Sequence, residues 1–379
     1  MKQRLDLIRE FSIPLLAGVA AALAWANLAP EAYAGFKEAP LLGPLSLEFI
    51  TNEIFMVFFF GIAAVEITTA CLPGGSLNPP KKAVNPLLAT LGGVAGPALL
   101  YLLLNALAGS PELVRGWGIP TATDIALAWL TARLIFGARH PIVSFLLLLA
   151  IADDAIGLII IAAFYPDPSH PVVPAWLALT ALGMLAAFAL RRTKARSYWP
   201  YLLLGGGLAW TGLFLAHLHP ALALVFIVPI LPHALRQDGH SPQGDPSAPP
   251  TLTRFEHDWK AVVDFGLFLF GLCNAGVPLS GAGTATWLVL ASLVAGKTAG
   301  ITLLGWLAVR MGFPLPSGMR YGHLLAAGTI AGIGFTVAIF VSGAAFTDPA
   351  LEGAAKMGAM LSLAAAPLAW GLARMMKLK

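Results

Sequence analysis

The sequence predicts an all-α, polytopic membrane protein with twelve transmembrane helices. Three observations lead to this prediction: 58% of the 379 residues are hydrophobic, only 11% are charged, and the apolar residues form repeated long runs. Soluble domains carry about 25% charged residues. A run of about 20 helical residues is needed to cross roughly 30 Å of hydrocarbon, and the runs in this chain reach that length. Lipid is therefore the solvent that most of the surface is expected to face.

The twelve predicted spans follow one another along the whole chain. They are 11–28, 54–72, 87–107, 119–136, 142–164, 172–190, 201–216, 220–231, 262–277, 287–311, 324–346 and 357–373. The range 220–231 is short for a span. Basic residues precede the first run, as in a signal peptide, but 11–28 is longer than the usual apolar core of such a peptide and is expected to remain as a helix.

We expect residues 1–379 to form a single membrane transporter domain, with two long connections. Residues 233–258 are rich in Pro, Gly, Ser and Asp, which predicts a cytoplasmic connection between two six-helix portions. The second connection, about residues 30–49, is predicted to be external. Its segment 45–49 (Leu-Ser-Leu-Glu-Phe) alternates apolar and polar residues as a strand does, which favours a small hairpin.

The distribution of basic residues predicts the orientation. Nineteen of the 23 Lys and Arg residues fall on the side of the N-terminus, whereas only Lys37, Arg115 and Lys356 fall on the opposite side. Cytoplasmic loops carry the excess of positive charge, so both termini are predicted to be cytoplasmic, in a multi-pass protein of the cell (inner) membrane. The net charge of +4 lies in those same loops and indicates no nucleic-acid partner.

Six charged residues fall within predicted spans. They are Glu66, Asp124, Asp153, Asp154, Asp264 and Lys297. Each costs roughly 2.5–3.5 kcal/mol at a helix centre on insertion scales, so such residues normally face a cavity and serve a function. Asp264 has an alternative explanation, as a carboxylate near the cytoplasmic end of its helix and close to Lys260.

Asp153 and Asp154 are the most informative of these residues, because about ten apolar residues flank them on each side. Neighbouring positions on a helix point about 100° apart, so the two carboxylates cannot chelate one ion equally. One of them is expected to bind an ion while the other contacts a different neighbour.

Two of the predicted spans carry signals for an interruption. Pro120 lacks a backbone donor and disfavours helix in the residue before it. Gly328, Gly332 and Gly334 mark a second break, although close helix packing also explains such glycines. Two interrupted helices in corresponding places of two halves indicate an inverted-repeat transporter site. There Asp124 could offset helix N-termini, and Lys297 could offset C-termini or pair with an aspartate.

These motifs together resemble the NhaA-type sodium/proton antiporters, nearly from end to end. The matching segments are 119–126 (Ile-Pro-Thr-Ala-Thr-Asp-Ile-Ala), 152–154 (Ala-Asp-Asp), 254–257 (Arg-Phe-Glu-His), 274–276 (Asn-Ala-Gly), 296–297 (Gly-Lys) and 332–336 (Gly-Ile-Gly-Phe-Thr). The resemblance implies twelve helices, inverted repeats, and discontinuous fourth and eleventh helices that cross. It also implies electrogenic exchange of two inward protons for each outward Na⁺ or Li⁺.

The resemblance also implies roles for individual residues. Asp154 is implied as the main Na⁺ ligand, with Asp153 as a second carboxylate paired to Lys297 and with Thr123 and Asp124 at the crossing. His219 and Glu256 match positions tied to the pH response, and Glu66 matches a carboxylate of the cytoplasmic funnel. The chain departs from the family where it carries Ala70 in place of a glutamate and Thr69 at a neighbouring position that is basic in the family, so strong alkaline activation is not expected.

The expected activity is transport without a resident cofactor. The transported Na⁺ is a hard cation, and it prefers the oxygen ligands that the aspartates, Thr123 and backbone carbonyls supply. Sodium and protons competing for the same oxygens, with alternating access, suffice for antiport. A homodimer is compatible with this prediction. The main alternative is a sodium-coupled symporter of an organic anion on a related inverted-repeat fold. An intramembrane aspartyl protease is disfavoured, because its two aspartates must come from different helices.

Overall fold

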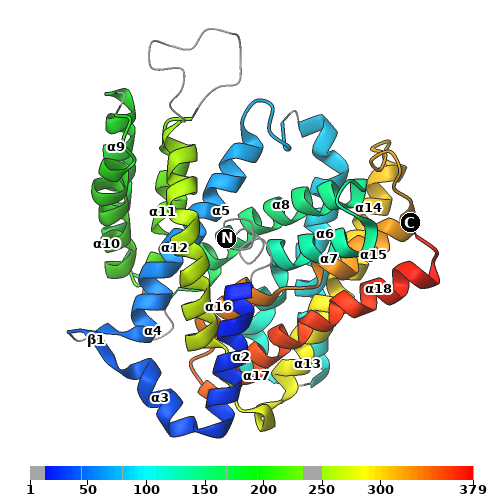
Figure 1. The fold of residues 1–379 in the computed structure, drawn as a ribbon, viewed down its shortest axis with the longest axis horizontal. Helices are drawn as coiled ribbons and strands as arrows, with labels where there is room; N and C mark the ends of the chain where they lie inside the picture. The colour runs from blue at the N-terminus through cyan, green and yellow to red at the C-terminus, as the bar shows by residue number, and fades with distance from the viewer. Residues whose placement is uncertain are drawn as a thin grey trace, which may run out of the picture.

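The structure is a computed structural model that describes residues 13–43, 45–78, 80–108, 110–166, 170–193, 195–233 and 250–378. It is helical almost throughout (Figure 1). The first half contains α2 (Ile13–Leu28), α3 (Pro30–Glu38), β1 (Pro40–Leu42), β2 (Leu45–Ser46), α4 (Leu47–Phe49), α5 (Met56–Cys71), α6 (Pro80–Ala108), α7 (Ile125–Phe136), α8 (Pro141–Phe164) and α9 (Leu177–Arg192). The second half contains α10 (Gly207–Leu215), α11 (Ala223–Ile227), α12 (Thr251–Asn274), α13 (Thr284–Ala291), α14 (Lys297–Arg310), α15 (Tyr321–Ala331), α16 (Phe335–Ala345), α17 (Pro349–Leu361) and α18 (Ala365–Met375).

Short 3₁₀ and π segments join several of these helices into longer ones. Within the described ranges, six helices are long and apolar enough to cross a membrane, and the number is eight if each of two bent pairs is one span. The six are Leu47–Cys71, Ala83–Leu107, Pro141–Phe164, Pro174–Arg192, Thr284–Arg310 and Pro349–Met375. Shorter apolar helices cover Ile13–Leu28, Tyr201–Leu215 and Pro220–Ile230. A polytopic helical membrane architecture is therefore confirmed, and most of each of the twelve predicted ranges is helical where the structure describes it, although their number as membrane spans stays a prediction.

The two bent pairs are the interrupted helices that the sequence indicates. A 3₁₀ helix, Pro111–Thr121, and α7 enclose an angle of 55°, and α15 and α16 enclose an angle of 48°. The predicted fourth span begins at Ile119, whereas the first bent pair already begins at Pro111, since 3₁₀ turns cover the residues before Pro120.

Two predicted connections differ from the structure in detail. The segment 45–49 is a strand only over Leu45–Ser46, which pairs antiparallel with β1. Helix begins at Leu47, because the Ser46 hydroxyl accepts a hydrogen bond from the Phe49 amide as an N-cap, at 3.1 Å. In the polar stretch 233–258, α12 already begins at Thr251, and residues 234–249 lie outside the described residues.

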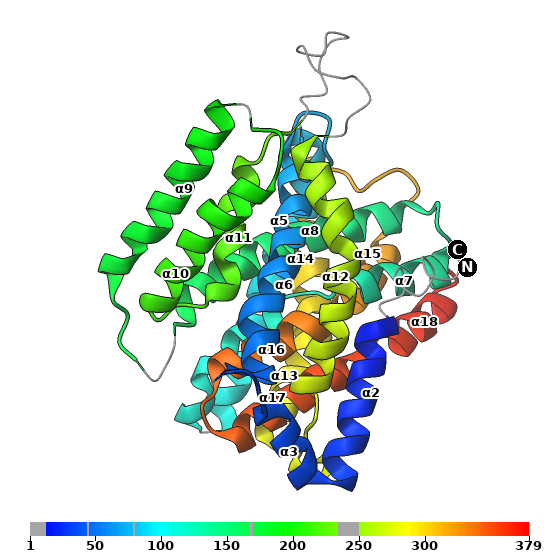
Figure 2. The ribbon, with the colours of Figure 1, turned by 60° about the vertical axis from the view of Figure 1, so that its left-hand side comes forward.

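The helices form two groups that meet at α5 and α8. One group contains α2, α5 and α9–α12, in which α2 and α5 both pack on α12 and α11 packs on α5. The other contains α6–α8 and α13–α18. Figures 1 and 2 show α9 and α10 at the outer edge of the first group and α18 at the far side of the second. The boundary between the groups is where the charged residues of the spans gather.

Helices α6 and α14 touch through their backbones. A Cβ added to Gly92 would lie 2.1 Å from the Gly300 carbonyl oxygen, and one added to Gly96 would lie 2.5 Å from the Gly296 carbonyl oxygen. Small residues allow such close approach between membrane helices, where van der Waals packing drives association. Lys297 is the first residue of α14 and lies inside this contact, so its backbone position is fixed relative to α6.

Candidate functional site

The two breaks contact each other through backbone groups. The break 122–124 follows the 3₁₀ helix of the first bent pair, and the break 332–334 separates α15 from α16. The Asp124 amide donates a hydrogen bond to the Ile333 carbonyl at 2.7 Å. A Cβ added to Gly334 would lie 2.9 Å from the Ala122 carbonyl oxygen, so a larger residue would push the two backbone segments apart. Backbone groups that an interruption frees must find partners inside the protein, and here each break supplies one for the other.

The carboxylate of Asp124 caps two helices. Its Oδ1 atom accepts a hydrogen bond from the Leu127 amide of α7 at 3.1 Å. Its Oδ2 atom accepts from the Thr336 amide of α16 at 3.3 Å and from the Thr336 hydroxyl at 2.5 Å. Both N-termini carry partial positive charge and unpaired amides, which one negative side chain satisfies. The role expected for Asp124, to offset helix N-termini, is therefore present in the geometry.

Asp153 forms an ion pair with Lys297, and both side chains are fully buried. The Lys297 ammonium also donates a hydrogen bond to the Thr123 hydroxyl at 2.8 Å. That hydroxyl lies 2.7 Å from Asp153 Oδ2 and 2.9 Å from the carbonyl of Ala331, the last residue of α15. Since a hydroxyl has one proton, it donates to one of these two oxygens at a time. The cluster joins α8, α14 and both breaks.

Asp154 points away from this cluster and lines a cavity of about 630 Å³. Asp153 does not line it, in agreement with the divergence expected for neighbouring positions of a helix. Within the described residues, Asp154 Oδ1 has no hydrogen-bond partner. The walls come from α2, α5, α7, α8, α12 and α16, so the cavity lies between the two helix groups. Its charged lining residues are Glu66, Asp124, Asp154, Lys260 and Asp264.

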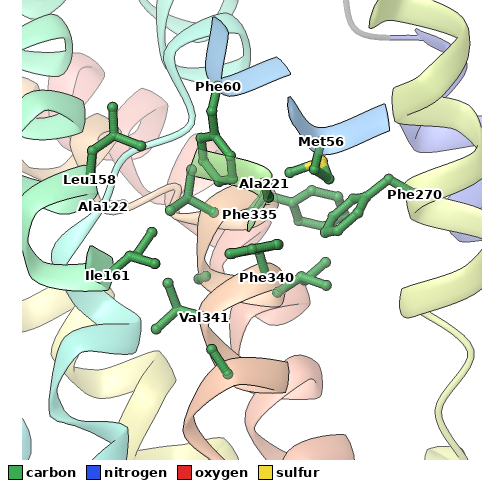
Figure 3. Packing of buried hydrophobic residues seen from close by; sticks show 14 of the residues in the cluster. Met56, Phe60, Ala122, Leu158, Ile161, Ala221, Phe270, Phe335, Phe340 and Val341 are labelled. Carbon is green, nitrogen blue, oxygen red and sulfur yellow. The ribbon is translucent and has the colours of Figure 1, made fainter. Parts of the chain in front are cut away.

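Apolar side chains fill the space on the other side of Asp154. A pocket of only about 10 Å³ adjoins it there, lined by residues such as Phe60, Leu158 and Ile161. A cavity of that size is at the lower limit for a single water molecule. Figure 3 shows these side chains together with those of α16. The rings of Phe60 and Phe340 pack edge to face, with centroids 5.1 Å apart. Asp154 is therefore open on one side to a cavity that carries further charged side chains among apolar ones, and it is closed off by a hydrophobic cluster on the other.

The structure does not bring the three predicted pH-response and funnel residues together. Glu66 lines the cavity, and its carboxylate interacts electrostatically with the charges of Lys260 and Glu256. His219, in contrast, precedes a short 3₁₀ helix, and its ring lies 5.6 Å from that of Phe340 in the hydrophobic cluster.

The position where the family carries a glutamate is closed. Ala70 is 5% exposed, and the loop after α5 folds over it. The Leu77 amide donates to the Ala70 carbonyl at 2.9 Å, and a Cβ added to Gly75 would lie 2.4 Å from that oxygen. The neighbouring Thr69 is exposed. The departure from the family is thus accompanied by a tightly packed loop in which a glutamate side chain would have little room.

Two residues of the site have no role in the prediction from sequence. Thr336 falls in a segment that matches the family, but no role is predicted for it. Its position indicates one, because it lies in the first turn of the helix after the predicted break, where backbone amides need hydrogen-bond partners. Lys260 was noted only as a neighbour of Asp264, yet it lines the cavity. Its place one helical turn before Asp264 was the clue.

The chain is similar to known proteins over nearly its whole length. The family model described as Na⁺/H⁺ antiporter 1 matches residues 6–373. Proteins described as Na(+)/H(+) antiporter NhaA are similar over nearly the full length. The one from Geobacter sulfurreducens is 66% identical over 96% of this chain and 95% of its own. The one from Geobacter metallireducens is 64% identical over 100% of this chain and 99% of its own. The one from Desulfitobacterium hafniense (strain DCB-2) is 62% identical over 100% of this chain and 97% of its own.

Proposed function

Because the chain belongs to the Na⁺/H⁺ antiporter 1 family, whose members are transporters and not enzymes, we propose that it exchanges cytoplasmic Na⁺ (or Li⁺) for external protons at the Asp153–Asp154 pair. The observation that carries this assignment is that the two carboxylates of the pair have different surroundings. Asp154 faces the cavity, whereas Asp153 is bound to Lys297. One carboxylate is therefore accessible to a cation, and the other is part of a second site that can exchange a proton.

The proposed mechanism is competition for oxygen atoms. Sodium bound from the cavity would be held by Asp154, with the Thr123 hydroxyl within reach of the same region because Thr123 also lines the cavity. A proton on Asp154 removes the charge that attracts the cation, so the two substrates exclude each other. Asp154 and the Asp153–Lys297 pair supply two protonation sites, which fits the exchange of two protons per Na⁺ that the family resemblance implies.

Alternating access requires that Asp154 face one side of the membrane at a time. The cavity is lined by Glu66 in the last turns of α5 and by Lys260 in the first half of α12, and the predicted orientation places these helix ends in the cytoplasm. The hydrophobic cluster around Phe60 closes the opposite side. We therefore propose that this is the inward-facing state of an inverted-repeat transporter in the inner membrane, with both termini cytoplasmic and with the fourth and eleventh of twelve helices crossing at their breaks.

The charge of the cavity disfavours the rival function, symport of an organic anion. That function needs a cationic clamp for the anion, and Lys297 is already engaged with Asp153. Lys260 is a second base, and it lines the cavity. However, the described lining contains four carboxylates against this one ammonium group, which favours a cation as the ligand.

Transport by purified protein in liposomes tests the proposal. With Na⁺ trapped inside, an imposed negative interior potential is expected to speed Na⁺ efflux coupled to proton uptake. If two protons enter for each Na⁺ that leaves, one net charge moves inward, and about 100 mV then contributes about 2.3 kcal/mol. Li⁺ should replace Na⁺, whereas K⁺ should not. A rate of Na⁺ efflux that does not depend on the membrane potential would contradict the electrogenic exchange. The absence of Na⁺-dependent proton flux would contradict the function itself.

We predict a weakly pH-gated profile, because Ala70 and Thr69 remove titratable groups from the cytoplasmic end of α5. Between about pH 6.5 and 9, the maximal rate at saturating Na⁺ is expected to change by less than about tenfold. The apparent Na⁺ affinity serves as the internal control, since it must still fall at acidic pH where protons compete for Asp154. A rise of several hundredfold in the maximal rate would show that a strong pH gate exists.

A further inference from the structure

Two hydroxyl groups line the cavity that Asp154 faces, those of Thr123 and Thr336. Each comes from a different interrupted helix, since Thr123 lies in the break 122–124 and Thr336 is the second residue of α16. A hard cation takes several oxygen ligands, so the Asp154 carboxylate alone does not complete its coordination. In the described lining, these two hydroxyls are the uncharged side-chain oxygens that could add a neutral ligand.

The Thr123 hydroxyl already contacts a positive charge. It accepts a hydrogen bond from the Lys297 ammonium at 2.8 Å, and it lies 2.7 Å from Asp153 Oδ2 and 2.9 Å from the Ala331 carbonyl oxygen. Its proton goes to one of these two oxygens, which leaves one lone pair on an atom that touches an ammonium group. A cation bound there would lie beside the Lys297 charge, so Thr123 is the weaker ligand of the two.

The hydrogen bond of the Thr336 hydroxyl leaves its oxygen available. The hydroxyl donates its one proton to Asp124 Oδ2 at 2.5 Å, so the two lone pairs of Thr336 Oγ1 remain. Among the described residues, no donor contacts this oxygen. Because Asp124 also lines the cavity, the hydroxyl lies on the side of α16 that faces it. Thr336 thus presents acceptor positions to the cavity, as a ligand for a cation must.

The charges around Thr336 also suit a cation. The N-terminus of α16 would by itself repel one, because its amides carry partial positive charge. Asp124 offsets that charge, since its Oδ2 atom accepts from the Thr336 amide at 3.3 Å as well as from the hydroxyl. Donation to a carboxylate makes the hydroxyl oxygen a stronger acceptor, because linked hydrogen bonds polarise one another. Asp124 and Asp154 interact electrostatically, so the hydroxyl lies in a region of negative potential.

We propose that the Thr336 hydroxyl oxygen is a direct ligand of the cation bound at Asp154, and that Asp124 holds it in the orientation that ligation requires. The inference rests on the proposed function and adds one neutral ligand to it. The bound ion would then connect a carboxylate of α8 with the first turn of α16, which is the half of the second bent pair that follows its break.

The test compares three substitutions of Thr336 in proteoliposomes by their KM for Na⁺ and their maximal rate. Thr336→Val removes the oxygen at nearly constant shape. Thr336→Cys replaces it by a soft sulfur, which is a poor Na⁺ ligand but can still donate weakly to Asp124. Both are expected to raise KM about five- to thirtyfold at an unchanged maximal rate, the effect of one lost contact to a charged group. Thr336→Ser should keep the wild-type KM.

Thr131→Val is the matched control. Thr131 lies on α7, the corresponding half of the first bent pair, and its hydroxyl donates to the Leu127 carbonyl at 2.8 Å. It does not line the cavity, so this variant should have the KM of wild type. Binding is measured separately through thermal unfolding in detergent, because a bound cation raises the unfolding midpoint. The Na⁺ concentration that gives half of this rise should increase in Thr336→Val and Thr336→Cys as KM does.

The outcomes separate the inference from the function beneath it. If wild type shows no Na⁺-driven proton flux, the proposed function fails, whatever Thr336 does. If wild type is active, the inference requires a higher KM in Thr336→Val and Thr336→Cys and a wild-type KM in Thr336→Ser, and any other pattern contradicts it. A loss of maximal rate at unchanged KM would leave Thr336 with its contact to Asp124 alone. A lower KM in Thr336→Val would mean that the hydroxyl shields Asp124 from the cation. Should Thr336→Val prove unstable in thermal unfolding, Thr336→Cys decides in its place.

Discussion

Asp154→Asn is expected to abolish Na⁺-driven proton flux while leaving the protein folded. Asparagine has nearly the shape of aspartate, but it neither carries the negative charge that holds Na⁺ nor binds and releases a proton in the physiological range. Asp154 lines the cavity with one oxygen that has no partner among the described residues, so its loss breaks no hydrogen bond at that atom. Flux in proteoliposomes should fall to that of protein-free vesicles.

Thermal unfolding in detergent checks that the variant is intact, and its midpoint should not fall below that of wild type. Asp258→Asn makes the same chemical change at an exposed carboxylate of α12 and should retain full flux. Near-normal Na⁺-driven flux in Asp154→Asn would refute the assignment of Asp154 as the ion ligand, whatever the behaviour of the other aspartates.

Lys297→Ala is expected to lower the stability of the protein by about 3–5 kcal/mol, because it leaves the charge of Asp153 buried without its partner. Both side chains are fully buried, so water cannot replace the ammonium group without a rearrangement. Lys297→Arg should retain part of the stability, since its positive charge survives. The measurement is thermal unfolding in detergent at fixed pH, Na⁺ concentration and scan rate.

A double-mutant cycle with Asp153→Asn tests whether the pair is the cause. If the ion pair matters, the double variant should be more stable than the sum of the two single losses predicts, with a coupling beyond about 0.5 kcal/mol. The competing explanation is that Lys297 mainly offsets the partial charges of helix ends. In that case Asp153→Asn would leave stability almost unchanged, and the two effects would add. Strict additivity would therefore remove the ion pair as the source of stability.

The breaks could be predicted from the sequence because local chemistry determines them. Pro120 restricts the backbone around itself, and Gly332 and Gly334 tolerate close approach, so both interruptions were expected within a few residues of where they occur. The predicted hairpin is present, but its second strand covers only Leu45–Ser46 of the segment 45–49, for an equally local reason. Alternation of apolar and polar residues favours a strand, but Ser46 is also a good N-cap, and the helix that begins at Leu47 replaced most of that strand.

The contacts between distant segments could not be predicted from residue patterns. Lys297 is 144 residues away from Asp153, and a pattern analysis left open whether it would pair with an aspartate or offset helix C-termini. Only the resemblance to a family pointed to the pair. The double cap by Asp124 depends on the distance between the two breaks, and the facing of Asp264 into the cavity depends on how α12 is rotated against α5. Both are properties of the packed structure and not of the local sequence.

The glycine contact between α6 and α14 limits how the protein can be engineered for thermostability. Replacing a helical glycine by alanine commonly stabilises a protein by about 0.4–1 kcal/mol, because it restricts the unfolded chain. At Gly92, Gly96, Gly296 and Gly300 the added methyl would meet backbone atoms at 2.0–2.6 Å, forcing the helices apart and carrying Lys297 away from its partner. Gly207 and Gly371 have no such neighbours within 4 Å. A library of stabilising substitutions should therefore include the last two positions and leave the first four unchanged.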